Sequence, residues 1–164
     1  MSVQAVASWL LISAVESADR AWNDWTTSDI ALLRCGGLFA AVRMSAGLVH
    51  AAAGSDEPKP VCGFLDEALH GGPVFTDQLS SRYYALVPPS AAQRPEWTDG
   101  RHEGAECLGI GSYLGVPSPT LDEEHGHRCY WCVPMMGPGN LCTADAVSQL
   151  VLYGRYRLAI GAAS

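Results

Sequence analysis

Apolar residues recur every three or four positions at the start of the chain, and this spacing predicts one long amphipathic helix. The stripe lies within residues 3–25 and consists of Val3, Val6, Leu10, Leu11, Val15, Ala18, Trp22 and Trp25. Trp9 and Ile12 fall outside it, so we expect a second apolar surface on this helix. We therefore divide the chain into an N-terminal helix at 1–28 and a single domain at 29–160.

Short apolar runs between glycine, proline and turn residues predict strands in the rest of the chain. The clearest case is a hairpin in which Val74-Phe75 and Tyr83–Val87 flank the polar turn at 77–81 and Pro88-Pro89 ends the second strand. Further strands are expected at 38–44, 107–116 and 128–133, and shorter helical segments at 46–53, 60–69 and from Thr143 onward.

This order of elements predicts the fold class. Strands that follow one another as hairpin-like pairs, with few helices between them, favour an α+β fold in which helices pack on one face of one mainly antiparallel sheet. A doubly wound parallel sheet would need more alternating helices.

Composition and charge limit the partners. The 164 residues are 48% hydrophobic, enough to fill one core, and only 16% are charged. The formal net charge of −7 and a single lysine, Lys59, argue against strong non-specific binding to a nucleic acid. Because few charges oppose self-association, we expect a protein partner or a homodimer formed through Trp9 and Ile12 of the N-terminal helix.

The location is predicted to be cytoplasmic. The apolar stretch near the N-terminus lacks the basic segment of a signal peptide, and acidic residues follow it closely. No run approaches the roughly 18 apolar residues of a membrane-spanning helix.

Six cysteines leave three interpretations open. In the cytoplasm we expect them mainly as reduced, buried thiols. A disulfide or redox role is a second possibility. The third is zinc, because Cys129 and Cys132 have Cys-x-x-Cys spacing, and Cys142 with either His127 or His125 would complete four ligands. Since residues three apart on a strand point to opposite faces, that site would need a bend, and we expect the protein to fold without zinc.

A small-enzyme interpretation rests on a stretch rich in aromatic residues at 82–102. A cleft there would combine five ligand-binding candidates, namely Asp77, Tyr83, Tyr84, Trp97 and His102. No serine or cysteine of the chain lies in a recognisable nucleophile motif such as Gly-x-Ser-x-Gly. The catalytic residues of such an enzyme therefore stay unassigned.

The order of several segments between Leu32 and Leu152 resembles the small bacterial primase/polymerase-like domains. The segments are Phe39-Ala-Ala-Val-Arg-Met-Ser, a helix, Gly72-Pro-Val, Tyr83-Tyr-Ala-Leu-Val-Pro-Pro-Ser, a loop, Leu108-Gly-Ile-Gly-Ser-Tyr-Leu-Gly-Val-Pro and Tyr130-Trp-Cys-Val-Pro. The resemblance implies an RRM-like core in which an acidic pair at the end of an early strand holds a divalent metal for nucleotidyl transfer.

This chain departs from that pattern at the two positions that matter most. Arg43 and Ser45 stand where the resemblance places the two carboxylates, and neither side chain is an anionic metal ligand. The resemblance therefore implies a degenerate, non-catalytic member that acts as a binding, regulatory or accessory protein. The alternative is a small enzyme or zinc-binding module that uses the 82–102 stretch or the cysteine cluster.

Overall fold

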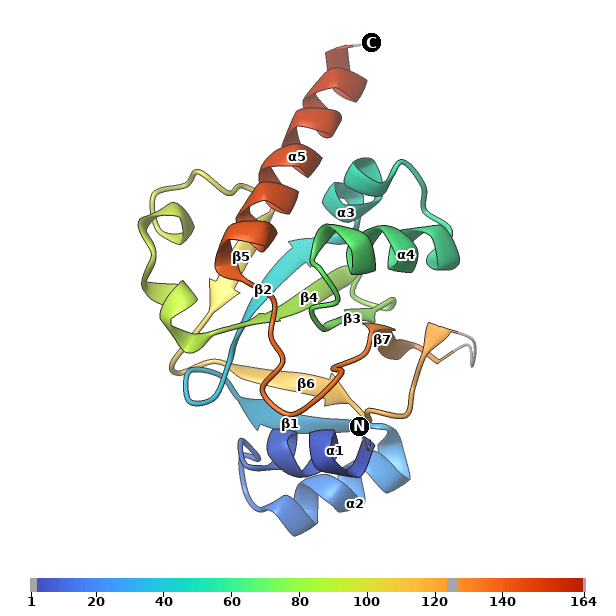
Figure 1. The fold of residues 1–164 in the computed structure, drawn as a ribbon, viewed down its shortest axis with the longest axis vertical. Coiled ribbons are helices and arrows are strands. Elements are labelled where there is room, and N and C mark those ends of the chain that lie inside the picture. Colours follow the sequence, from blue (N-terminus) through green and yellow to red (C-terminus); the bar gives the residue numbers. More distant parts are fainter. Residues whose placement is uncertain (1–2, 124–126, 164) are drawn as a thin grey trace.

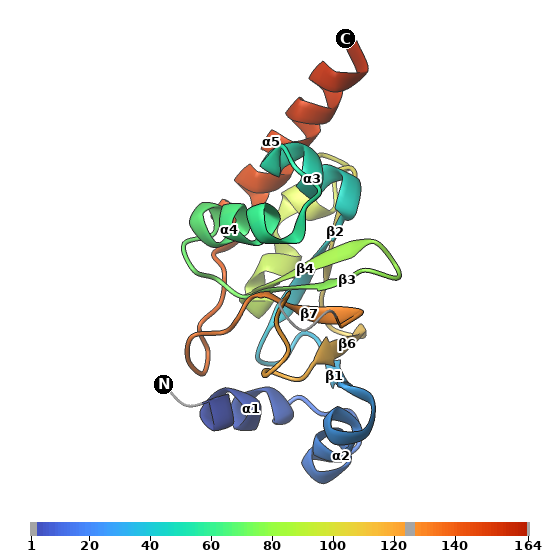
Figure 2. The same cartoon turned by 90° about the vertical axis from the view of Figure 1, so that its right-hand side faces the viewer.

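The computed structural model describes residues 3–123 and 127–163, with the side chains of 162 and 163 excepted, and it confirms the α+β class. A five-stranded antiparallel sheet has the order β5-β2-β4-β3-β7, and a two-stranded antiparallel sheet pairs β1 with β6. Helices α3, α4 and α5 lie on one side of the larger sheet, and β1, β6, α1 and α2 lie toward the opposite end of the molecule (Figures 1 and 2). Among the described helices, none combines the length and apolar character that crossing a bilayer requires.

The predicted hairpin is confirmed at the centre of the larger sheet. Strand β3 (Val74–Asp77) pairs with β4 (Arg82–Val87), and β4 pairs with β2 (Ala40–Ser45). Strand β5 (Ala105–Leu108) forms one edge beside β2, and β7 (Cys129–Val133) forms the other edge beside β3.

The first hydrophobic core lies between the larger sheet and three helices, α3 (Ala46–Ala53), α4 (Pro58–Ala68) and α5 (Ala144–Ala163). Alternate residues of each strand face it, as the two-residue period of a strand requires. Its fully buried members include Val42, Leu48, Val61, Leu65, Val74 and Val147.

The second core lies on the opposite face of the same sheet. It is closed by β1 (Ile30–Arg34), β6 (Tyr113–Pro117), α1 (Val3–Leu11) and α2 (Ala18–Ser28). The expectation of helices on one face only is therefore incomplete, because strands and two further helices cover part of the other face. Trp25 also donates a hydrogen bond to the backbone oxygen of Val116 over 2.9 Å, so the N-terminal segment shares this core.

The prediction of one helix over 3–25 is wrong, because the segment forms two helices. Residues 12–17 turn the chain, and Ala14 makes a β-bridge with Leu33. Ser17 then begins α2 as an N-cap whose side chain accepts a hydrogen bond from the Arg20 amide over 3.1 Å. The apolar spacing alone does not reveal this break, and it does not mark one buried face either, since Ala18 and Trp22 of the predicted stripe are exposed.

The single strand predicted at 107–116 is also divided. Strand β5 ends at Leu108, a turn follows at 109–112, and β6 belongs to the smaller sheet. Gly111 has a φ of 92° in this turn, a conformation that glycine adopts without steric cost. The glycine therefore marks a change of sheet.

Candidate functional site

Polar and charged side chains occupy one end of the sheet face that the second core covers elsewhere. On β2, Ala41 is buried in that core, and Arg43 and Ser45 follow it on the same face at two-residue intervals. Across the sheet, Arg43 pairs in register with Tyr84 and Glu106, and Ser45 pairs with Arg82. We call this end of the face, made of Arg43, Ser45, Arg82, Tyr84, Glu106 and Asp77, the open sheet end.

A depression of about 290 Å³ lies at the open sheet end. Its lining consists of Arg43, Ser45, Arg82, Gly104, Ala105 and Glu106. The guanidinium of Arg43 forms an ion pair with the carboxylate of Glu106. The Ser45 hydroxyl caps α3 by accepting a hydrogen bond from the Leu48 amide over 3.3 Å. The depression is thus built from three adjacent strands and the start of one helix.

A second ion pair lies beside this depression. Arg128 Nε is 3.3 Å from Asp77 Oδ1, and the Leu79 amide donates to the same oxygen over 3.1 Å. Burial acts to raise the pKa of Asp77. Hydrogen bonds from Arg128 and from other groups, together with the positive charge of Arg128, lower it by more, so the pKa lies below its usual value. Asp77 is therefore an ionised carboxylate that is paired with Arg128.

The charge balance of the open sheet end differs from that of the whole chain. Its two carboxylates, Glu106 and Asp77, are each engaged by an arginine. Arg82 is exposed and forms no ion pair with any residue that the structure describes. When Arg128, which pairs with Asp77 from the neighbouring strand end, is counted with Arg43 and Arg82, three arginines stand against two carboxylates on a chain of net charge −7. Such a region attracts anions.

The five ligand-binding candidates do not meet in one cleft. Tyr83 and Tyr84 are neighbours on a strand, so they point to opposite faces. Tyr83 is buried toward α3 with its hydroxyl 3.0 Å from His50 Nε2, and burial raises its pKa to about 12. Tyr84 lies on the other face and stacks on Phe75, with ring centroids 4.8 Å apart. Asp77 shares this second face, at the open sheet end.

The structure brings the last two candidates, Trp97 and His102, together. Their ring centroids are 4.4 Å apart, and His102 Nε2 lies 2.7 Å from the Ser148 hydroxyl of α5. Only 4% of His102 is exposed, and burial lowers its pKa. Trp97 Nε1 and His102 Nδ1 are buried without a hydrogen-bond partner among the described residues. This is an interior contact between a loop and a helix.

The predicted zinc ligands are separated. Cys132 is bonded to Cys62, and Cys142 is buried beside Pro73, whose oxygen accepts from its thiol over 3.5 Å. Cys129 faces the second core, and His127 Nδ1 is 3.7 Å from Asp29 Oδ2. His125 lies outside the described residues. In the described part of the chain, no three histidine, cysteine or carboxylate side chains are grouped as a metal site requires.

The expectation of reduced cysteines is wrong for one pair. Helix α4 packs against β7, which brings the Cα atoms of Cys62 and Cys132 to 4.8 Å, and the two residues form a disulfide. Cys35, Cys107, Cys129 and Cys142 are free. Burial raises the pKa of Cys129 and of Cys142 to about 12, so these thiols stay protonated near neutral pH and are poor nucleophiles.

Sequence reasoning missed Arg82 and Glu106 as site residues. A signal for this site existed at Arg43, since an arginine inside the apolar run 38–44 requires a polar environment on one face of that strand. Which residues of other strands share that environment depends on register, and the register became visible only in the fold.

Comparisons with known proteins add no identification. No family model, no curated protein and no solved structure matches this chain.

Proposed function

We propose that this chain is a non-catalytic, primase/polymerase-like binding protein, and that it binds an anionic group at the open sheet end. The observation that carries the proposal is the position of Arg43 and Ser45 beside Arg82 in one depression. One cation and one hydroxyl, Arg43 and Ser45, thus stand at the two positions where the family resemblance expects metal-binding carboxylates, and Arg82 lies beside them. We expect the protein to act in the cytoplasm, as a homodimer or with a protein partner.

The strand order supports the family part of the proposal. Helices α3 and α4 connect β2 to β3, β3 and β4 form a hairpin, and β5 returns to the far side of β2. The resulting order β5-β2-β4-β3 is that of a split β-α-β unit, the arrangement of RRM-like cores. Two short 3₁₀ segments, η1 (Pro89–Gln93) and η2 (Pro95–Trp97), stand between β4 and β5 where such a unit has its second helix.

The side chains at the open sheet end favour an anion over a metal ion. Arginine stays protonated and presents a planar set of donors that fits carboxylate and phosphate oxygens. Magnesium requires oxygen ligands, and Glu106, the one carboxylate in the depression, is already paired with Arg43. A bound anion would lie against Arg82 and compete with Glu106 for Arg43.

The test of the non-catalytic part is a primer-extension assay. Purified protein with primer, template, nucleotides and either Mg²⁺ or Mn²⁺ is expected to add no nucleotides. Glu106→Ala and Asp77→Ala variants serve as controls for contaminating polymerase. Extension that these substitutions abolish would overturn the proposal, whereas extension that survives them identifies a contaminant.

The binding part is tested separately with inorganic pyrophosphate as the probe, in isothermal titration calorimetry. Arg82→Gln and Arg43→Gln are each expected to weaken binding by about 10- to 150-fold, since a hydrogen bond to a charged group is worth about 1.5–3 kcal/mol. Arg128→Gln removes the same charge outside the depression and is expected to change affinity less than about twofold. If all three variants lost the same amount of affinity, the binding would be general electrostatic attraction and not a specific site at the depression.

The small-enzyme alternative is favoured by one observation, the 2.7 Å contact between His102 Nε2 and Ser148 Oγ. Such a pair resembles a serine nucleophile and its base. The burial of His102 counts against it, because no substrate reaches the imidazole in this arrangement. Hydrolysis of p-nitrophenyl acetate that Ser148→Ala abolishes would favour the enzyme instead.

A further inference from the structure

Three contacts tie the loop before β5 to helix α5. This segment, residues 98–104, is here called the β5 loop, and it lies beside α5 (Figure 1). His102 Nε2 is 2.7 Å from Ser148 Oγ. Arg155 donates a hydrogen bond to the backbone oxygen of Arg101, and its guanidinium lies 3.8 Å from the Glu103 carboxylate. Arg101 and Glu103 are exposed, so the His102 contact is the buried one of the three.

The surroundings of His102 suit a neutral imidazole. Its ring lies against that of Trp97, and only 4% of the residue is exposed. A neutral imidazole carries one N–H, whereas an imidazolium carries one on each ring nitrogen. His102 Nδ1 has no hydrogen-bond partner among the described residues, and the indole of Trp97 offers a donor but no acceptor. Protonation would therefore bury a charged N–H without an acceptor, which is costly.

The charged groups around the imidazole supply no free counter-ion. They are Glu96 of η2, Asp99 and Arg101 of the β5 loop, and Arg155 of α5. Glu96 lies 2.9 Å from Arg94, and Asp99 lies 2.7 Å from Arg101, so each carboxylate already has a cation. Burial is the largest influence on His102, and it lowers the pKa of the imidazole although the two carboxylates oppose it.

The β5 loop leads into one wall of the depression at the open sheet end. Gly104, Ala105 and Glu106 line this wall. Across the depression, the Ser45 amide donates a hydrogen bond to the Gly104 backbone oxygen over 3.0 Å. Gly104 is two residues from His102, so a β5 loop that leaves α5 displaces this wall.

We propose that the β5 loop is a proton-sensitive latch on the anion site. With His102 neutral, the loop rests on α5 and completes the depression. With His102 protonated, the loop leaves α5 and the depression loses one wall. Because the anion binds the closed form, it stabilises the closed loop, and closure in turn favours the anion. The coupling to the anion rests on the proposed function, whereas the release by acid follows from the burial of His102.

An ordinary electrostatic effect would have the opposite sign. Protonation of a histidine adds positive charge, which by itself strengthens the binding of an anion. In the latch, protonation favours the open loop and thereby weakens binding. The direction of the pH dependence therefore separates the two mechanisms.

Amide hydrogen exchange measured by mass spectrometry tests the latch, because exchange of the loop amides reports local opening. Protection factors, corrected for the intrinsic exchange rate at each pH, are compared at about pH 7.5 and about pH 5.5. The wild-type β5 loop is expected to lose protection up to about tenfold at the lower pH, since an exposed imidazole of pKa about 6.5 is then about nine-tenths protonated. Inorganic pyrophosphate at about ten times its dissociation constant is expected to raise protection about tenfold.

Two variants and one segment serve as controls. His102→Gln keeps a polar group that reaches Ser148 but does not titrate, so the protection of its β5 loop is expected to be independent of pH. His50→Gln replaces another histidine bonded to a hydroxyl, that of Tyr83 at 3.0 Å, and is expected to behave like the wild type.

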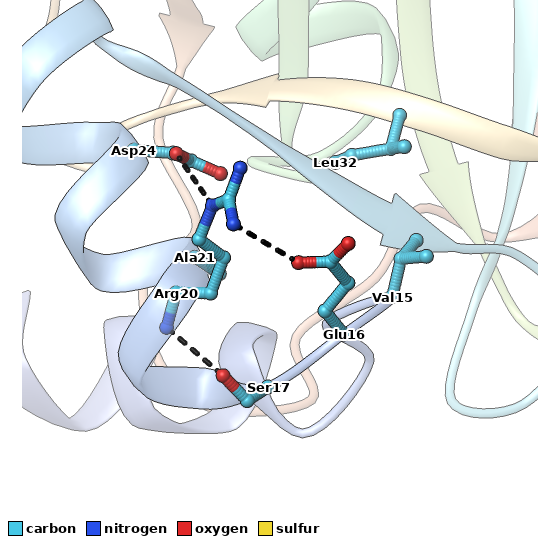
Figure 3. A pocket seen from close by; sticks show the side chains of 7 residues that line it. All are labelled: Val15, Glu16, Ser17, Arg20, Ala21, Asp24 and Leu32. Carbon is cyan, nitrogen blue, oxygen red and sulfur yellow. Dashed lines mark hydrogen bonds and ion pairs between the residues drawn. The ribbon is translucent and has the colours of Figure 1, made fainter.

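The control segment is 15–24, which contributes most of the lining of a cavity of about 160 Å³ between α2 and β1. Figure 3 shows the Arg20 guanidinium there between the carboxylates of Glu16 and Asp24, at 3.3 and 3.5 Å. The segment carries ion pairs like those of the β5 loop but no histidine. Its protection is expected to be the same at both pH values.

The outcomes are distinguishable. A wild-type β5 loop whose protection is equal at both pH values would overturn the latch, and this measurement needs no variant to fold. An equal loss of protection in the wild type and in His102→Gln would also overturn it. Pyrophosphate that binds without protecting the loop would disprove the coupling. Pyrophosphate that binds at neither pH would contradict the proposed anion site, while the pH comparison still decides whether His102 releases the loop.

Discussion

His102 Nε2 lies 2.7 Å from Ser148 Oγ, and this contact joins the segment before β5 to helix α5. Two others reinforce it: Arg94 Nη2 is 2.7 Å from Asp145 Oδ1, and Arg155 donates to the backbone oxygen of Arg101. Gly104 and Glu106, which line the depression at the open sheet end, lie two and four residues after His102. The loop's attachment to α5 therefore supports one wall of the proposed anion site.

The burial of His102 predicts a pH-dependent stability. Burial lowers the pKa of the folded imidazole below 6.5, with Arg101 and Arg155 acting in the same direction and Glu96 and Asp99 opposing. As the pH falls below about 6.5, the unfolded chain takes up the proton first, so the free energy of unfolding decreases until the folded imidazole is protonated too. Above that pH both states are neutral and the contribution is constant.

Urea unfolding from pH 8 to pH 5 measures this effect. His102→Asn is expected to lower stability at pH 8 but to flatten the profile between pH 7 and pH 5. His70→Asn is the matched control, since His70 is exposed and has a φ of 54°, a conformation that asparagine tolerates. An unchanged slope in His102→Asn would show that other groups cause the pH dependence.

The Cys62–Cys132 disulfide closes a long loop, with a sequence separation of 70 residues. Its reduction is expected to lower the free energy of unfolding by about 2–5 kcal/mol, because the cross-link restricts the unfolded chain. Thermal unfolding with and without a phosphine reductant measures the difference. Cys132→Ser should reproduce the reduced value and abolish the response to reductant, while Cys107→Ser, a free thiol, should keep the response.

Two glycines of α5 predict opposite responses to alanine. A Cβ at Gly154 would lie 2.8 Å from both Cδ2 and the backbone oxygen of Leu48, so Gly154→Ala is expected to cost about 1–3 kcal/mol by forcing α5 away from α3. A Cβ at Gly161 meets no atom within 4 Å, and Gly161→Ala is expected to leave stability unchanged or raise it by up to about 1 kcal/mol. Denaturant titration of both variants checks the pair. Equal destabilisation would contradict the α3–α5 packing.

Trp9 belongs to the fold of its own chain, which changes the expectation for its replacement. Its ring lies 6.2 Å from that of Phe39, and it is partly buried against the second core. Trp9→Ala is therefore expected to lower the free energy of unfolding by about 1–3 kcal/mol, less than for a fully buried tryptophan. Ile12→Ala, at an exposed position, should change it by less than about 0.5 kcal/mol. A Trp9→Ala variant that keeps its stability but no longer self-associates would instead support the homodimer contact through the N-terminal helix.

The sequence by itself determined the local structure of the sheet. The apolar runs at 38–44 and 83–87 form β2 and β4, and the polar turn at 77–81 joins β3 to β4. These elements follow from residue type and two-residue alternation, which act over a few neighbours. Arg43 is likewise visible within the apolar run 38–44, although its surroundings are not.

The tertiary structure decided the relationships between distant segments. Register placed Arg82 beside Ser45 and Glu106 beside Arg43, and packing of α4 on β7 joined Cys62 to Cys132. The apolar period that is continuous in the sequence was divided between two helices. A strand shifted by one residue would turn the same side chains to the opposite face. Local pattern cannot specify such pairings, because they depend on how the whole chain buries its apolar surface.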